Sequence, residues 1–314
     1  MLFTHLTAVQ SGGVQVDVSL ATSIVRRYFQ PRLTVTSIRK LYGGSINQVQ
    51  QWMTDGSPSV IVAKLNSRPD GRMFEREMAY LELYRAQTEF PVPEPYAWFN
   101  NDIDFGGSGL LMGKVEAVTL ADARLSPMGV KHFQRQLAHH VARLHDHHRH
   151  YYGSALEEHG QDTWLDAFRP AFEMEFRAVR DSLSSRSREV VDRLIQHMDR
   201  WLPEEASPTL IHGDLWATNI LIDDGHPDKP RIKAFIDASA SYCDPEYELA
   251  YLRVFHTAAE EFFTVYSQYH SLRDGFSRRC RLYWLCTLMM QLRLYGHSYL
   301  PTCEKLIREI PALM

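Results

Sequence analysis

Hydrophobic spacing divides the chain into a first part of short strands with two helices and a second part dominated by helices. In residues 17–30, "DVSLATSIVRRYFQ", apolar residues recur at helical spacing before Pro31, which predicts a helix that ends there. Residues 34–66 contain three short β segments separated by a Gly-Gly turn and a "DGSP" turn, which predicts an antiparallel meander. Residues 73–87, "MFEREMAYLELYRAQ", carry one apolar face and predict a second helix.

One more strand, "GSGLLMGKV", is predicted before the character of the chain changes at about residue 118. Beyond it, helical spacing predicts five long helices, at residues 131–148, 163–180, 187–201, 246–269 and 278–295. Only two short strands, "NILIDD" and "IKAFIDA", are predicted among them. The sequence therefore predicts a small lobe over residues 1–113, built on an antiparallel sheet, and a larger, mainly helical lobe over residues 114–314.

Composition and charge favour a folded chain and exclude several classes of protein. Hydrophobic residues at 45% and charged residues at 23% lie near the globular average, which argues against disorder. The net charge of -4 offers no basic surface to a nucleic-acid backbone. The apolar segment "LYWLCTLMMQLRLY" is interrupted by Gln291 and Arg293, so we expect a buried helix and no membrane span.

Cysteine spacing and the N-terminus predict a cytoplasmic protein. The four cysteines form no C-x-x-C pair and no zinc spacing, so we expect reduced thiols. The first residues, "MLFTHLTAVQSGG", lack the positive charge and apolar core of a signal peptide. The oligomeric state stays open.

The stretch "LIHGDLWATNILIDD" places a carboxylate and a carboxamide on a short connection between two apolar runs. Phosphoryl transfer to an alcohol needs a carboxylate for the hydroxyl proton and an amide oxygen that helps to hold a metal ion. Asp214 and Asn219 fit these roles, and the protein-kinase catalytic loop has its Asp and Asn at the same separation. In "AFIDAS", Asp237 ends a short strand, where a second carboxylate can complete a Mg²⁺ site.

Lys64 lies in the middle of the apolar strand "VIVAKLN", which is costly for an ammonium group without a partner. In kinases such a lysine holds the nucleotide phosphates and is anchored by a helix glutamate. Glu77 is the candidate partner and Glu75 is the alternative. A pair on the surface with little energetic effect is the competing interpretation.

The segment "YGGSIN" can lay backbone N–H groups over phosphates, with Gly43, Gly44 and Ser45 as the candidates. A simple hairpin turn is the alternative for this segment. The elements follow the kinase order along the chain: Gly loop, strand Lys, helix Glu, Asp-x-x-x-x-Asn and a second Asp. This order predicts an α+β, bilobal protein-kinase-like phosphotransferase that uses ATP and Mg²⁺.

The sequence resembles the fructosamine kinase family, within the larger aminoglycoside-phosphotransferase-like group. The matching stretches include "GGSIN", "VAKLN", "MFEREMAYLELY", "DTWLDAF" and "LIHGDLWATNI", in family order over most of the chain. The most specific is "HGDLWATN", because a Trp directly after His-Gly-Asp-Leu is typical of fructosamine kinases.

The resemblance implies ATP-dependent phosphorylation of a sugar hydroxyl on a ketosamine, a sugar attached to an amine. It makes Asp214 the catalytic base. The residues that it assigns to the nucleotide and its metal ion are Lys64 for the phosphates, Glu77 as its partner, Asn219 and Asp237 for Mg²⁺, and Met112, Lys114 and Glu116 in the hinge that receives adenine through backbone groups. It places Trp216 and Trp164 near the acceptor, with core packing as the alternative for each.

Two other functions stay open. The stretch "CDPEYELA" resembles the wider phosphotransferase group, so the acceptor can instead be an aminoglycoside or another amino-alcohol. The third hypothesis is a non-catalytic nucleotide-binding module, and the presence of Lys64, Asp214, Asn219 and Asp237 together argues against it. In either kinase the partner is a small sugar-amine or amino-alcohol substrate.

Overall fold

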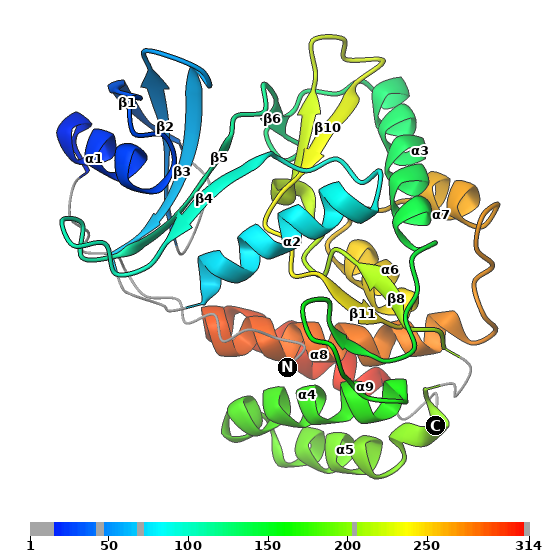
Figure 1. Cartoon of the computed structure of the whole chain (residues 1–314). Coiled ribbons are helices and arrows are strands. Elements are labelled where there is room, and N and C mark those ends of the chain that lie inside the picture. The colour runs from blue at the N-terminus through cyan, green and yellow to red at the C-terminus, as the bar shows by residue number, and fades with distance from the viewer. Residues whose placement is uncertain (1–15, 42–46, 68–71, 203–205, 311–314) are drawn as a thin grey trace. The chain divides into compact units, whose positions relative to one another are not determined.

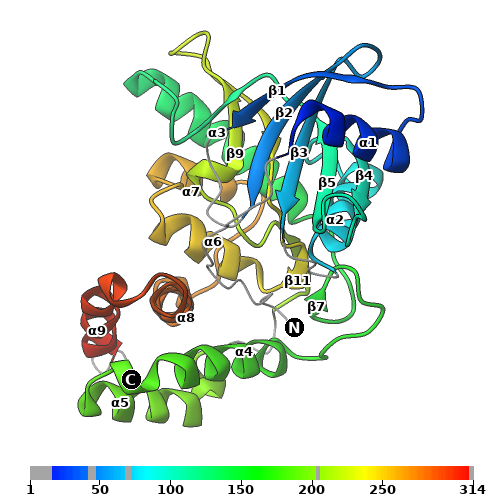
Figure 2. The ribbon, with the colours of Figure 1, turned by 90° about the vertical axis from the view of Figure 1, so that its left-hand side faces the viewer.

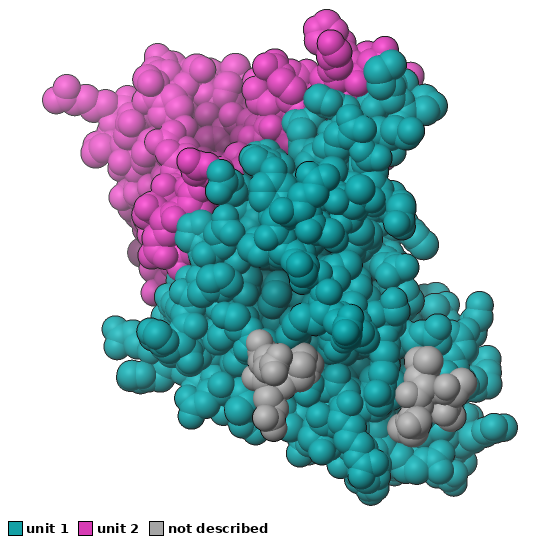
Figure 3. All heavy atoms as spheres, turned by 90° about the vertical axis from the view of Figure 1, so that its right-hand side faces the viewer, with its two compact units in different colours: residues 1–6, 126–217, 239–314 teal, residues 7–125, 218–238 magenta. Residues whose placement is uncertain are grey.

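The structure is a computed structural model of the chain that describes residues 16–41, 47–67, 72–202 and 206–310. The chain forms two compact units (Figure 3). Among the described residues, the sheet unit, as we call it, comprises those from 16 to 125 together with 218–238, and the helical unit comprises those from 126 to 217 together with 239–310. Each unit is described by itself. The functional boundary expected between residues 113 and 114 stays a prediction.

The described residues of the sheet unit form two antiparallel sheets and two α-helices (Figure 1). Its elements are α1 (Val18–Tyr28), β1 (Val35–Leu41), β2 (Gln48–Thr54), β3 (Val60–Asn66), α2 (Met73–Gln87), β4 (Pro95–Phe99), β5 (Ser108–Gly113), β6 (Val118–Thr119), β9 (Ile220–Asp223) and β10 (Arg231–Phe235). The five-stranded sheet has the order β1-β2-β3-β5-β4, and the smaller sheet has the order β10-β9-β6. The predicted meander and the helix at residues 73–87 are confirmed.

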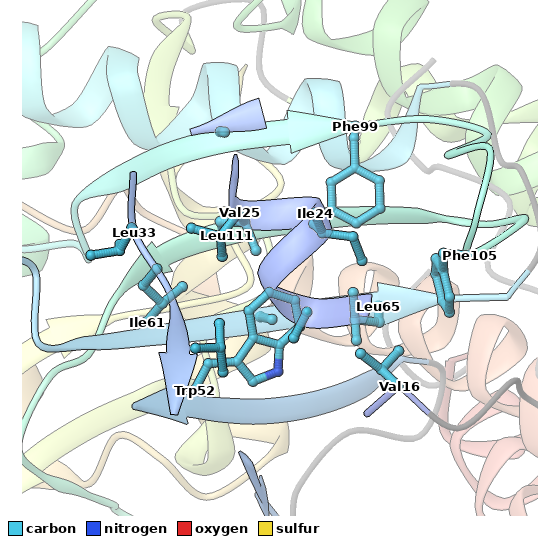
Figure 4. Close-up of a cluster of buried hydrophobic side chains, with 14 residues drawn as sticks. Val16, Ile24, Val25, Leu33, Trp52, Ile61, Leu65, Phe99, Phe105 and Leu111 are labelled. Carbon is cyan, nitrogen blue, oxygen red and sulfur yellow. The ribbon is translucent and has the colours of Figure 1, made fainter. Parts of the chain in front are cut away.

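A hydrophobic core between α1 and the five-stranded sheet holds the sheet unit together (Figure 4). Asp17 caps the start of α1 by accepting the Leu20 N–H at 2.8 Å. The buried face of the helix, including Ile24, then lies in one cluster with Trp52 of β2 and Ile61 of β3. Burial of each such side chain contributes roughly 1.5–3 kcal/mol. The core therefore fixes β3, which carries Lys64.

The helical unit contains seven α-helices among the described residues, with one small antiparallel sheet (Figures 1 and 2). Its α-helices and strands are α3 (Pro127–Leu144), β7 (Gly153–Ser154), α4 (Trp164–Val179), α5 (Ser185–Gln196), β8 (Thr209–Ile211), β11 (Ser241–Cys243), α6 (Pro245–Val254), α7 (Glu260–Tyr266), α8 (Phe276–Tyr295) and α9 (Leu300–Glu309). Three-residue 3₁₀ turns occupy Arg180–Ser182, Met198–Arg200 and His297–Tyr299. Helix α8 packs against α4, α6 and α9, and the sheet has the order β7-β11-β8.

The predicted helix at residues 246–269 is wrong, because the chain breaks into α6 and α7. The break passes through His256, whose φ of 54° is incompatible with a right-handed helix. Gln134 of α3 replaces the lost helical hydrogen bonds by donating to the Thr257 carbonyl and accepting the Ala259 N–H, each at 2.8 Å. A tertiary contact therefore overrides the local pattern.

Helix α9 and strands β4, β6, β7, β8 and β11 were not predicted. The expected buried helix is present as α8. None of the described helices combines the length and the apolar character that crossing a membrane requires. All four cysteines are buried and free.

Candidate active site

Lys64 forms a buried ion-pair network in the sheet unit. Its ammonium lies 2.6 Å from Glu77 Oε1 and 2.8 Å from Asp237 Oδ1, and the residue is 7% exposed. Burial alone lowers the pKa of Lys64, but the negative charges of Asp237 and Glu77 outweigh it and raise that pKa. Lys64 is therefore a fixed positive charge at any physiological pH.

Helix α2 supplies Glu77 from the face that packs on the sheet. Phe74, Glu77, Leu81 and Tyr84 follow one another at spacings of three and four residues, so they share that face. Burial and the charge of Asp237 raise the pKa of Glu77, whereas Lys64 acts in the opposite direction. The alternative partner, Glu75, is exposed. The predicted pairing of Lys64 with Glu77 is thus the one observed.

Asp237 follows β10 and is the more open of the two carboxylates. Its side chain is 43% exposed against 12% for Glu77. Its φ of 61° is left-handed, a conformation that Asp tolerates better than most residues. The tight backbone at this point turns the carboxylate toward Lys64 directly after the strand.

Asn219 is brought to the same end of the β9–β10 pair as Asp237. It ends a 3₁₀ turn (Ala217–Asn219) and is 5% exposed. Its carbonyl accepts the Ile236 N–H at 3.0 Å, and the next pair in the ladder is Ile220 with Phe235. Two residues that are distant in sequence therefore become close neighbours in the backbone.

The donor chemistry of Asn219 and Asp237 suits a magnesium ion. Amide and carboxylate oxygens are hard ligands, and Mg²⁺ in nucleotide sites is usually held by one or two protein groups together with phosphates. Within the described ranges, no cluster of three or more His, Cys, Asp or Glu side chains is arranged to hold a metal ion. The pair offers one amide and one carboxylate oxygen donor, which fits an ion that takes its other ligands from elsewhere.

In the helical unit, the loop after β8 carries Asp214 on a tight and anchored backbone. Gly213 has a φ of 83°, and a Cβ there would lie 2.4 Å from the Ser239 carbonyl oxygen. The Gly213 N–H donates to Glu248 Oε1 at 2.8 Å, and the Asp214 N–H donates to His212 Nδ1 at 3.2 Å. Glycine is therefore required at the position before Asp214.

Helix α6 contacts this loop through two residues that the sequence analysis did not single out. Besides Glu248, it supplies Tyr251, whose hydroxyl donates to Asp214 Oδ1 at 2.5 Å. Glu248 is 1% exposed, and its second oxygen lies 3.2 Å from His145 Nε2. The spacing of three residues between Glu248 and Tyr251 was the available signal, because it places both on one helix face.

The two tryptophans assigned to the acceptor differ in exposure. Trp216 is 36% exposed, and its ring lies 5.8 Å from that of Phe255. Trp164 is 2% exposed, and its indole N–H donates to the Tyr283 hydroxyl at 2.9 Å. This environment matches the core-packing alternative for Trp164, and contact of either tryptophan with an acceptor stays a prediction.

The remaining nucleotide candidates lie at the end of β5 or outside the described residues. Met112 is buried in β5, and Lys114 beyond it pairs with Glu116 at 2.7 Å. Gly43, Gly44 and Ser45 lie outside the residues that the structure describes. Their proposed roles stay predictions.

Comparison with known proteins identifies the family. A model described as fructosamine kinase matches residues 19–312. The chain belongs to the fructosamine kinase family. Ketosamine-3-kinase of Mus musculus is 24% identical over 308 residues, which cover 85% of this chain and 93% of that family member. A probable ketoamine kinase of Staphylococcus aureus is 28% identical over 197 residues, 54% of this chain.

Coverage of the bacterial relatives is partial. The chain spans 63% of the length of the Staphylococcus aureus protein and 36% of a probable ketoamine kinase of Enterococcus faecium. The family assignment therefore rests on the match to residues 19–312, which extends over both compact units.

Solved structures confirm the fold. A fructosamine-3-kinase candidate from Thermobifida fusca superimposes with a TM-score of 0.71 at 19% identity, over 94% of this chain and 100% of that chain. A thermostable mutant of aminoglycoside phosphotransferase APH(4)-Ia, in a ternary complex with ADP and hygromycin B, gives 0.66 at 20% identity, over 92% and 98%. At these identities the likeness establishes the fold alone. The predicted α+β, bilobal protein-kinase-like fold is correct.

Proposed function

We propose that the chain transfers the γ-phosphate of ATP, with Mg²⁺, to a hydroxyl of a ketosamine. The observation that carries this proposal is the buried network of Lys64 with Glu77 and Asp237. Kinases hold nucleotide phosphates with a strand lysine that a helix glutamate anchors, next to an aspartate that binds the metal ion. The acceptor class follows from membership of the fructosamine kinase family and from the Mus musculus ketosamine-3-kinase.

Lys64 binds phosphate oxygens in this proposal, and Glu77 keeps its side chain in place. Asn219 and Asp237 hold Mg²⁺, which supplies positive charge to the phosphates when it is bound. The backbone between Met112 and Glu116 receives the adenine. Gly43, Gly44 and Ser45 cover the phosphates with backbone N–H groups. The fixed charge of Lys64 supports this division of roles.

The proposed step is an in-line displacement at the γ-phosphorus. The acceptor hydroxyl oxygen forms a bond to phosphorus while the bond to the β–γ bridging oxygen breaks. ADP leaves with that electron pair, and the hydroxyl proton passes to the carboxylate of Asp214. Because the transition state is loose, orientation of the hydroxyl by Asp214 contributes more than strong basicity.

The exposed ring of Trp216 supports an acceptor contact two residues from Asp214. An aromatic face packs on the apolar side of a sugar ring and attracts a cationic amine, and a ketosamine offers both. An aminoglycoside or another amino-alcohol shares this chemistry and is the alternative acceptor.

The test is ADP release by the purified chain with ATP and Mg²⁺ across ketosamines, free sugars and aminoglycosides. Mass spectrometry of each acceptor checks that a phosphate has been added. We expect selective turnover of ketosamines that falls by at least about a hundredfold in Asp214→Asn. Selective turnover of an aminoglycoside would reassign the acceptor. Nucleotide binding without any phosphorylated product would instead favour the non-catalytic module.

A further inference from the structure

The hydroxyl of Tyr251 lies against the carboxylate that the proposed reaction uses. The oxygen-to-oxygen distance to Asp214 Oδ1 is 2.5 Å, in the range of short hydrogen bonds to an ionised acceptor. Both residues belong to the helical unit. Each carboxylate oxygen offers about two lone-pair directions, so Asp214 can accept from Tyr251 and from an acceptor hydroxyl together.

Burial makes Tyr251 a permanent donor. Its removal from water, followed by the charge of Asp214, raises the pKa of the phenol well above its ordinary value. The hydroxyl therefore keeps its proton over the working range of the protein. Tyr247, one turn earlier on α6, also interacts with the charge of Asp214, and His212 contacts the Asp214 backbone.

Packing holds the Tyr251 ring in place. Its centroid lies 4.6 Å from that of Phe255, which in turn contacts Trp216. The same helix holds the Gly213 N–H through Glu248, one turn before Tyr251. Helix α6 thus contacts both the backbone before Asp214 and the Asp214 side chain. Because a rigid helix contacts both the backbone and the side chain, the Asp214 carboxylate has little rotational freedom.

We propose that Tyr251 is a positioning residue that fixes the plane of the Asp214 carboxylate for the acceptor hydroxyl. The proposal rests on the proposed function for the role of Asp214, and on the observed geometry for the contact itself. Tyr251 acts through Asp214 and does not exchange a proton with the acceptor. A positioned carboxylate matches a step in which orientation contributes more than basicity.

The kinetic test compares Tyr251→Phe, which loses only the hydroxyl, with Tyr152→Phe. Tyr152 is also buried, and its hydroxyl donates to the carbonyl of Ala206, in a loop without catalytic residues. We expect kcat of Tyr251→Phe to fall about tenfold, while KM for ATP stays unchanged. A tenfold fall in kcat corresponds to a rise of about 1.4 kcal/mol in the activation free energy. We also expect a change in the acid limb of the pH–rate profile, where kcat falls as Asp214 takes up a proton. In Tyr251→Phe this limb should move to higher pH, because the ionised Asp214 carboxylate has lost a hydrogen-bond donor.

Tyr152→Phe should leave both kcat and the acid limb unchanged. An unmoved acid limb in Tyr251→Phe, or an equal loss of kcat in both variants, would overturn the positioning role.

A measurement without substrate separates this proposal from the proposed function. ¹³C NMR of chains labelled at the aspartate carboxyl carbons reports on Asp214 directly, and the resonance that disappears in Asp214→Asn assigns it. We expect Tyr251→Phe to shift this resonance and to move its titration midpoint to higher pH, while Tyr152→Phe leaves both in place. An unchanged resonance refutes the proposal even if ketosamines are phosphorylated. A shifted resonance in a chain that phosphorylates no ketosamine supports the positioning and refutes the proposed function.

Discussion

Lys64 lies between two carboxylates, and its removal is expected to affect stability and turnover for different reasons. Lys64→Met leaves Glu77 and Asp237 next to each other without a cation. We expect the free energy of unfolding to fall by about 2 kcal/mol, less than for a fully buried pair because Asp237 is partly exposed. Turnover should fall at least about a hundredfold, because the nucleotide phosphates lose their fixed positive charge.

Adding Glu77→Gln to Lys64→Met removes one of the two repelling carboxylates. The double variant should therefore regain most of the lost stability and none of the lost turnover. Urea unfolding and ADP release measure the two effects separately, with the exposed Lys131 of α3 changed to Met as the matched control. If the double variant were as unstable as Lys64→Met, charge repulsion would not be the cause.

Gly213 and Gly106 provide a second comparison at single residues. Both have positive φ, 83° and 69°, so alanine costs about 1 kcal/mol of backbone strain at either position. Only at Gly213 does the new methyl group meet backbone, at 2.4 Å from Ser239, whereas at Gly106 nothing lies within 4 Å. We expect Gly213→Ala to displace Asp214 and to abolish most turnover.

Gly106→Ala is the matched control for this comparison and should remain active with slightly reduced stability. Kinetics and thermal unfolding of both variants check the comparison. Equal activity of the two variants would mean that the loop tolerates the displacement.

At the scale of elements, the local sequence pattern predicted the helices and strands whose formation depends on neighbouring residues. It missed the breaks and contacts that depend on residues far away in the sequence. Strand β3 and helix α2 follow directly from their spacing, so the pairing of Lys64 with Glu77 could be predicted. The spacing of Glu248 and Tyr251 placed both on one helix face, but the contact of Tyr251 with Asp214 could not be predicted, because it requires the loop after β8 to meet α6. The break after α6 was missed for the same reason, since Gln134 on α3 supplies its hydrogen bonds.

One partly buried carboxylate hydrogen-bonds across the contact between α5 and α9 and gives a pH-dependent prediction. Glu304 of α9 accepts the Ser184 N–H at 2.7 Å and the Ser187 hydroxyl at 2.6 Å. Burial raises the pKa of Glu304, but these hydrogen bonds outweigh it, and the pKa is lowered from 4.5. A lowered pKa in the folded state adds stability above about pH 4.5, and this stability is lost as the pH falls.

Glu304→Gln should therefore reduce the free energy of unfolding by about 1 to 2 kcal/mol at pH 7 and by less at lower pH. Urea unfolding at several pH values tests the sign. Glu309→Gln on the same helix, whose ion pair with Arg281 at 3.5 Å is partly exposed, should have little effect. A loss for Glu304→Gln that grows as the pH falls would contradict the assignment.

At the scale of the whole molecule, the order of the motifs predicted the fold more securely than the individual elements did. Lys64, Asp214 and Asp237 are far apart in sequence, and each lies on the element that the kinase order requires. Strands β7, β8 and β11 have only two or three residues each. Such segments carry no periodicity of their own, because their pairing partners define them. The fold could thus be predicted without its smallest sheet.

Ligand linkage provides a test of the metal site on the intact chain. A nucleotide that binds only the folded state stabilises it by about 2.7 kcal/mol at a hundred times its Kd, which raises Tm by on the order of 5 °C. If Asn219 and Asp237 hold Mg²⁺, the shift caused by a non-hydrolysable ATP analogue should be larger with Mg²⁺ than with EDTA.

In Asp237→Asn the difference between Mg²⁺ and EDTA should disappear, because the amide replaces the carboxylate charge that attracts the ion. The Tm of each variant with ligand is compared with the Tm of the same variant without ligand. This removes the change in stability that arises because Asp237→Asn weakens the ion pair with Lys64. Asp223→Asn loses the charge that pairs with Arg231 at 3.2 Å on the surface, while its amide oxygen can still accept the Gly225 N–H, so this variant should respond like the unchanged chain. Equal shifts of the unchanged chain in Mg²⁺ and EDTA would show that nucleotide binding does not use the metal ion, and Asn219 and Asp237 would lose that role.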